Sequence, residues 1–137
     1  MTSPSLTPGV LLAKAQQAAA SAQALMALGD ADGACNRAYY AMFDAARAVL
    51  LVHGHPTREG GAKTHSGVIS AFSLQLVKTG QVPMSLGRAL KRAEETRVVA
   101  DYRGDSVTGD EASALVLQAQ EFVEAMLALC ESGAGEP

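Results

Sequence analysis

Five stretches of this chain carry apolar residues at the spacing of one helix face, and glycine, proline or helix-capping residues separate the stretches. Runs that alternate apolar and polar residues, which would predict strands, are absent. Alanine is the most frequent residue and isoleucine occurs once, a composition that favours helix. The sequence therefore predicts an all-α antiparallel bundle of four to five helices. The 137 residues match the length of one domain, expected over 1–137 with an ordered core at about 8–131.

Local signals give the expected bounds of these helices. The first covers Gly9 to Leu28, with Thr7 as its N-cap and Pro8 in its first turn. The others are expected at residues 30–53, from 63 or 64 to 78, at 85–101, and from 108 to about 131. Thr108 and Glu111 form the pattern of a capping box at the start of the last helix.

Charge and cysteine content limit the classes of partner and compartment. The formal net charge is −3, so a broad basic face for duplex DNA is not expected, although a local basic patch is compatible with it. Cys35 and Cys130 lie far apart, which is typical of two buried thiols in a reducing cytoplasm. The first residues lack the pattern of a signal peptide, and no run approaches the ~20 apolar residues of a membrane span. We therefore expect a cytoplasmic protein without a membrane partner.

The common signatures of enzyme sites are missing. The chain has no Walker loop, no GxGxxG, no HExxH and no nucleophile elbow. His53 and His55 are spaced for chelation, but no third ligand is evident, and such a pair at a helix end is more often solvated. The sequence therefore predicts neither a metal site nor a cofactor.

Several polar residues interrupt apolar helices. Asn36 and Arg37 open an otherwise apolar segment, while Lys63 and His65 lie at an expected helix start, where backbone N–H groups favour an anion. Arg97 and Asp101 are one helical turn apart, which is typical either of a surface ion pair or of a clamp for phosphate. Whether His65 reaches Arg97 depends on the packing of the helices.

Three segments together resemble the HEPN family (higher eukaryotes and prokaryotes nucleotide-binding). They are NRAYYAMFDAARAVL at 36–50, KTH at 63–65 and RVVADY at 97–102, and the resemblance covers roughly residues 8–130. It implies a helical bundle that forms a homodimer, often encoded beside a minimal nucleotidyltransferase as a toxin–antitoxin pair. Many family members are metal-independent ribonucleases whose signature is an arginine followed four to six residues later by a histidine at a dimer cleft. Arg97 matches the arginine, and Tyr102 stands where that histidine is expected.

Cleavage of RNA without a metal needs a base for the 2′-hydroxyl, an acid for the leaving oxygen and a cation for the phosphorane. The candidate catalytic residues are Arg97 as the cation, Asp101 beside it, Tyr102 as a proton donor, and His65 in place of the missing histidine. The candidate residues for binding nucleotide or RNA are Lys63, Arg37, Asn36 and Tyr40. Tyr39 and Tyr40 diverge by about 100° on a helix, so one of them can face the core and the other a cleft.

Two functions fit these residues, and a third possibility is purely structural. The first is a toxin that acts on RNA as a metal-independent endoribonuclease and is paired with a nucleotidyltransferase antitoxin. The alternative is a non-catalytic module that binds a nucleotide or a partner nucleotidyltransferase, because the replacement of histidine by Tyr102 leaves phosphate binding by Arg97 intact. The structural reading is an alanine-rich helical dimer.

Overall fold

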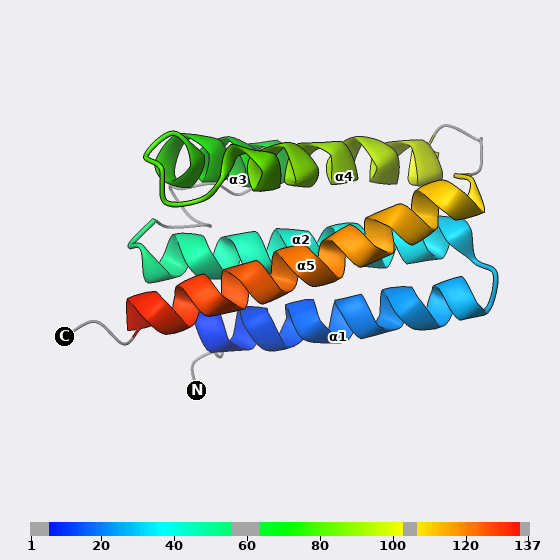
Figure 1. Ribbon diagram of the computed structural model, residues 1–137, viewed down its shortest axis with the longest axis horizontal. Helices are drawn as coiled ribbons and strands as arrows, with labels where there is room; N and C mark the ends of the chain where they lie inside the picture. The colour runs from blue at the N-terminus through cyan, green and yellow to red at the C-terminus, as the bar shows by residue number, and fades with distance from the viewer. Residues whose placement is uncertain (1–5, 56–63, 103–106, 135–137) are drawn as a thin grey trace.

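The computed structural model describes residues 6–55, 64–102 and 107–134. These residues form five α-helices, a π-helical segment and no strand, as Figure 1 shows. The all-α bundle predicted from the sequence is therefore confirmed. The elements are α1 (Pro8–Ala27), α2 (Ala31–Val52), α3 (His65–Phe72), the π-helical segment η1 (Ser73–Val77), α4 (Met84–Tyr102) and α5 (Gly109–Ala134).

The helices begin where local capping predicts. The side chain of Thr7 accepts a hydrogen bond from the backbone of Val10, and Asp30 caps α2 through the backbone N–H of Gly33 at 2.8 Å. The predicted capping box is present, since Glu111 N donates to Thr108 Oγ1 at 3.1 Å and Thr108 N donates to Glu111 Oε1 at 3.0 Å. The caps at Thr7 and Thr108 were predicted because each of these contacts spans only three residues of sequence.

The third helix differs from its expected form. A continuous helix to residue 78 was predicted, but the regular α-helix ends at Phe72 and a π-helical turn follows, in which Lys78 N donates to Ser73 O at 2.9 Å. This wider turn lies against α4 at Gly87, where an added Cβ would be 2.9 Å from Cγ2 of Val77. The π-helical turn therefore packs closely on α4. Lys63, the other expected start of this helix, lies outside the described residues.

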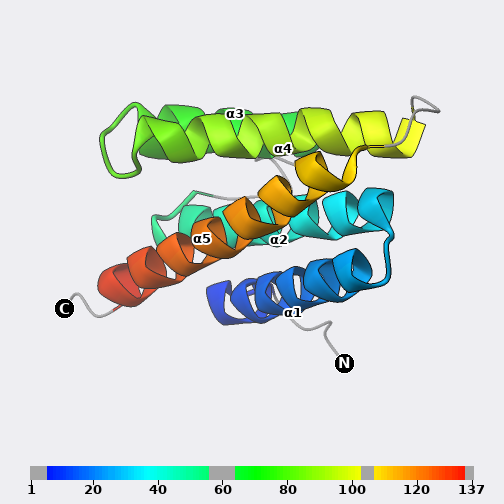
Figure 2. The same ribbon diagram turned by 45° about the vertical axis from the view of Figure 1, so that its right-hand side comes forward.

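The central element of the bundle is α2, which contacts each of the other four helices. Figures 1 and 2 show α1 on one side of it, α3 and α4 together on the other, and α5 running obliquely across the front of α2 between these two layers. The buried faces of α1 and α2 are rich in alanine, so their backbones approach closely. Larger side chains fill the space toward α5, where the rings of Phe72 and Phe122 lie 5.7 Å apart.

By length and composition α5 is apolar enough over Gly109–Ser132 to cross a membrane. In the bundle this apolar surface is used for packing, because one face of α5 lies against α2 and α1. Its buried residues are Ala112, Leu115, Val116, Ala119, Phe122, Val123, Met126 and Cys130. Hydropathy alone does not distinguish such a core helix from a membrane span.

Candidate functional site

Arg97 is the centre of a polar cluster that joins α4 to α2 and α3. It lies on the inner face of α4 and is only 8% exposed, although arginine is rarely buried unless it is paired. Its Nη1 is 3.5 Å from Asp101 Oδ2, and its Nη2 is 3.9 Å from Glu94 Oε2. The predicted pair with Asp101 is therefore present, and it joins a buried guanidinium to a carboxylate that lies exposed at the end of α4.

His65 reaches this guanidinium from the first turn of α3. Its Nδ1 is 3.4 Å from Arg97 Nη2 and 2.9 Å from the hydroxyl of Tyr39. The imidazole stacks on Phe43 with ring centres 4.6 Å apart, and the ring of Tyr40 is nearly perpendicular to it with ring centres 5.4 Å apart. The packing of α3 and α4 on α2 thus brings His65 into contact with Arg97, which the sequence alone could not decide.

The hydrogen bonds fix the protonation of His65. A guanidinium can only donate, so Nδ1 must present its lone pair and the neutral ring carries its proton on Nε2. Burial and the charge of Arg97 lower the pKa of His65 below its ordinary value, which also favours the neutral ring. Burial raises the pKa of Tyr39, so its phenol remains protonated and can donate to Nδ1. In this arrangement Nδ1 is occupied by two donors and Nε2–H is a donor.

The cluster continues to the start of α2. Asn36 Nδ2 donates to Asp101 Oδ2 at 3.1 Å, and Nε and Nη2 of Arg37 both lie 3.2 Å from Asn36 Oδ1. The guanidinium of Arg37 lies over the ring of Tyr40, 5.2 Å from its centre. A continuous polar chain therefore connects α2, α4 and α3.

The structure brings together six of the eight predicted site residues in this chain of contacts: Asn36, Arg37, Tyr40, His65, Arg97 and Asp101. Tyr102 lies at the edge of the cluster. The residue is 73% exposed, and the Arg97 guanidinium is 5.7 Å from the centre of its ring. The eighth, Lys63, lies outside the described residues.

Two members of the site were missed in the sequence. Tyr39 is fully buried, as expected for a core aromatic, yet its hydroxyl reaches His65 and its ring lies 5.1 Å from the Arg97 guanidinium. Glu94 precedes Arg97 by three residues on the same face of α4. The three-residue spacing could have predicted the pair of Glu94 with Arg97. The contact of Tyr39 with His65 joins distant residues, so no local pattern in the sequence predicts it.

One donor of Arg97 has no hydrogen-bond partner among the residues that the structure describes. Nε of Arg97 is buried and makes no hydrogen bond within the described residues. Burial lowers the pKa of Arg97, but the oxygens of Tyr40, Tyr39 and Asp101 outweigh this and hold the pKa above its ordinary value. A charged group with an unused buried donor costs folding stability. A charge that is buried at such a cost is more typical of a functional site than of a core selected for stability alone.

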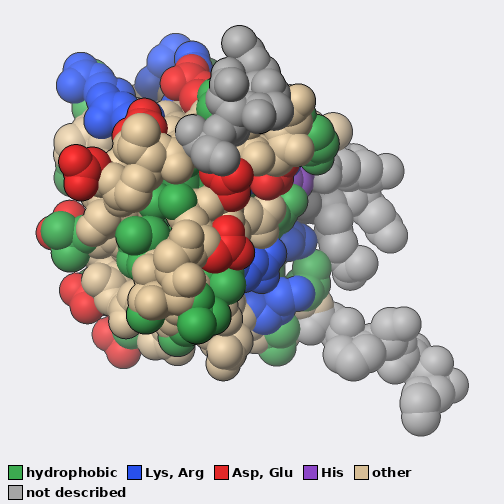
Figure 3. All heavy atoms as spheres, turned by 90° about the vertical axis from the view of Figure 1, so that its right-hand side faces the viewer, with side chains coloured by type: hydrophobic (Ala, Val, Ile, Leu, Met, Phe, Trp, Pro, Cys, Tyr) green, Lys and Arg blue, Asp and Glu red, His purple; other side chains and the backbone are tan. Residues whose placement is uncertain are grey.

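Other parts of the described chain add little to this site. No three His, Cys, Asp or Glu side chains in it gather in a way that could hold a metal ion. His53 instead bonds through Nδ1 to the backbone oxygen of Val49 at 3.0 Å. Figure 3, a view onto one end of the bundle, shows acidic and basic side chains interspersed, without a broad basic face on that side.

Comparison with known proteins gives a consistent family match. The family model described as the HEPN domain matches residues 9–129. A UPF0332 protein of Gloeobacter violaceus is 34% identical over 116 residues, which cover 83% of this chain and 88% of that protein. A UPF0332 protein of Thermotoga maritima is 37% identical over 100 residues, covering 72% of this chain and 71% of that protein.

A third relative carries a functional name. A Methanocaldococcus jannaschii protein named "Putative toxin" is 38% identical over 88 residues, which cover 64% of this chain. The match spans 62% of that relative's own length.

Proposed function

The chain belongs to the HEPN family, and from this premise we propose that it is the toxin of a toxin–antitoxin pair and acts on RNA as a metal-independent endoribonuclease in the cytoplasm. The observation that carries the proposal is the buried guanidinium of Arg97, held between Asp101, Glu94 and His65 with one donor unused. Arginine is well suited to clamp a phosphate, because its fixed donors match the phosphate oxygens. The toxin name of the Methanocaldococcus jannaschii relative supports the same class of function.

The proposed reaction is attack of a ribose 2′-oxygen on the adjacent phosphorus. The bond to the 5′-oxygen of the next nucleotide breaks, leaving a 2′,3′-cyclic phosphate and a 5′-hydroxyl. A phosphate is a stronger acceptor for Arg97 than the imidazole, so its binding would draw the guanidinium from Nδ1 of His65, 3.4 Å away. Once the Tyr39 hydroxyl, which donates to the same nitrogen at 2.9 Å, also turns aside, the single lone pair of Nδ1 takes the proton of the 2′-hydroxyl. Tyr102, exposed at the edge, gives a proton to the leaving oxygen, and Arg97 stabilises the charge on the phosphorane.

We also propose that two copies complete the site. Asp101 and Tyr102 lie exposed at the end of α4 beside Arg97, so a twofold axis at this edge would bring two guanidinium groups to one cleft. Size-exclusion chromatography with light scattering at micromolar concentration tests this directly. A dimer is expected, and a mass of 14.1 kDa would contradict it.

A nucleotidyltransferase antitoxin is the proposed partner. Co-expression with a nucleotidyltransferase from the neighbouring reading frame is expected to relieve growth inhibition and to co-purify with the chain. Growth inhibition that such a neighbour neither relieves nor binds would contradict the pairing.

The alternative function is a non-catalytic module that binds a nucleotide or the nucleotidyltransferase. Two observations favour it. Tyr102 stands where the family signature has a histidine, and two donors already contact Nδ1 of His65. Such a module would use the same clamp for phosphate without breaking a bond.

The decisive experiment compares the wild type with Arg97→Ala and with Arg92→Ala, an exposed arginine on the same helix. We expect the wild type and Arg92→Ala to inhibit growth and to cleave RNA in EDTA, and Arg97→Ala to do neither while remaining folded. Nucleotide binding that depends on Arg97, without cleavage, would establish the alternative. If no protein inhibits growth, cleaves RNA or binds a nucleotide, both functions fail.

A further inference from the structure

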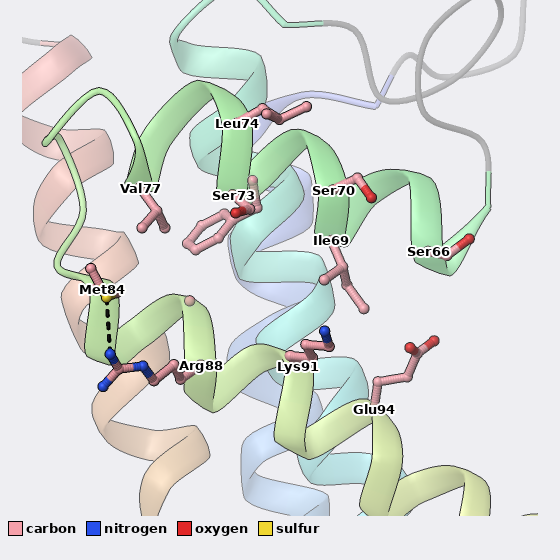
Figure 4. A pocket seen from close by; sticks show the side chains of 12 residues that line it. Ser66, Ile69, Ser70, Ser73, Leu74, Val77, Met84, Arg88, Lys91 and Glu94 are labelled. Carbon is pink, nitrogen blue, oxygen red and sulfur yellow. Dashed lines mark hydrogen bonds between the residues drawn. The ribbon is translucent and has the colours of Figure 1, made fainter.

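A groove beside the Arg97 cluster is not used by the proposed reaction. It has a volume of about 620 Å³, lies between α3 with η1 and α4, and is shown in Figure 4. This volume is in the range of sites for small ligands. Ile69, Phe72 and Val77 give it an apolar wall, and Ser66, Ser70 and Ser73 add hydroxyl groups along the same side.

Two cations line the opposite wall. Arg88 and Lys91 are exposed, stand one turn apart on α4, and have no carboxylate within 4.0 Å among the described residues. Figure 4 shows Lys91 extending toward Ile69 across the groove, while Arg88 turns to Met84, whose sulfur its Nη2 meets at 3.0 Å. A thioether is a weak acceptor, so Arg88 keeps its donors available for an anion.

The groove leads to the Arg97 cluster through Glu94. This carboxylate lines the groove one turn after Lys91 and lies 3.9 Å from Arg97 Nη2. On the facing helix, Ser66 follows directly after His65. A chain molecule lying in the groove would therefore place its next unit at Arg97.

We propose that this groove binds a neighbouring nucleotide of the single-stranded RNA whose scissile phosphate lies at Arg97. Arg88 and Lys91 hold its phosphate, and the partly exposed side chains of Ile69 and Val77 receive its base. A nucleotide uses both halves of the groove, because it combines an anion with a flat apolar ring. This assignment rests on the proposed action on RNA. It adds the path of the RNA strand, which would run from Arg97 along the groove.

The test is binding of a short, mixed-sequence, single-stranded 2′-O-methyl RNA, which lacks the attacking hydroxyl and stays intact. Its affinity is measured by fluorescence anisotropy across a series of salt concentrations. Lys91→Glu and Arg88→Glu are compared with Arg92→Glu, which makes the same charge change on the same helix outside the groove. Circular dichroism confirms that each variant is folded.

We expect each groove variant to weaken binding about tenfold, and to flatten the slope of log affinity against log salt by about 0.7, as for one lost phosphate contact. Arg92→Glu is expected to have a much smaller effect. Ile69→Ala should weaken binding without changing the slope, because it removes a contact to the base and not to a phosphate.

The outcomes separate this assignment from the proposed nuclease. If Arg97→Ala weakens binding while Lys91→Glu and Arg92→Glu have equal effects, the groove assignment is wrong and the action on RNA stands. If the groove variants lose binding but the wild type cleaves no RNA, the groove stands without the nuclease. Failure of the wild type to bind the oligonucleotide, or capture of an acidic protein segment by the groove instead, would overturn the assignment.

Discussion

The hydroxyl of Tyr39 lies 2.9 Å from Nδ1 of His65, across 26 positions of sequence. This contact connects the middle of α2 to the first turn of α3 and turns the imidazole toward Arg97. A buried phenol thereby contacts a histidine that the Arg97 guanidinium also contacts.

Tyr39→Phe removes this hydrogen bond and keeps the ring. We expect a loss of about 1 kcal/mol in the free energy of unfolding, because Nδ1 loses a donor while the aromatic packing is retained. Urea denaturation measures it. Tyr40→Phe is the matched control, since its hydroxyl makes no hydrogen bond among the described residues. Equal losses in the two variants would show that the contact contributes nothing specific.

His65 should titrate below its ordinary pKa, as followed by NMR of its ring protons. Arg97→Ala is expected to raise this pKa, because it removes a positive charge next to Nδ1 and opens the site to water. The unfolded chain binds the proton more tightly, so stability should fall as the pH drops below about 6.5. A pKa that stays unchanged in Arg97→Ala would contradict the contact.

His65→Ala tests the histidine as the base of the proposed reaction. Removal of a general base is expected to lower RNA cleavage at least ~100-fold. The measurement is the initial rate on a fluorescent RNA, with His53→Ala as the control outside the cluster. A His65→Ala variant as fast as the wild type would remove this residue from the mechanism.

Arg97→Lys tests whether the site needs the planar guanidinium or only a positive charge. A lysine keeps the positive charge but has no planar fork to meet Asp101, Glu94 and a phosphate together. We expect cleavage to fall nearly as far as in Arg97→Ala, by roughly 100-fold or more, with the fold retained. If Arg97→Lys keeps the wild-type rate, the site needs only a point charge.

Gly87→Ala should destabilise the bundle by about 1–3 kcal/mol, because the new Cβ would lie 2.9 Å from the stiff side chain of Val77. Gly109→Ala, where the Cβ meets nothing within 4 Å, should cost nothing. Thermal unfolding compares the two. Adding Val77→Ala to Gly87→Ala should recover part of the loss, and an unaltered double variant would rule out this clash as the cause.

Most of the fold was predictable because its determinants are local. The caps at Thr7 and Thr108 act within three residues, and helical periodicity marks the buried face of each segment. The Arg97–Asp101 pair and the short motifs around Asn36 and His65 were visible for the same reason. The π-helical turn at Ser73–Val77 was not predicted. Its close contact with Gly87 joins two elements that are separate in the sequence.

The sequence by itself therefore determined where the helices lie and which residue types a phosphate site would use. Only the tertiary structure decided that Arg97 is buried, that His65 contacts it, and that Tyr39 belongs to the site. Helix formation depends on contacts within about four residues, which one segment contains. The contacts of the site join residues 26, 32 and 65 positions apart, and those distances exist only after three helices have packed on one another.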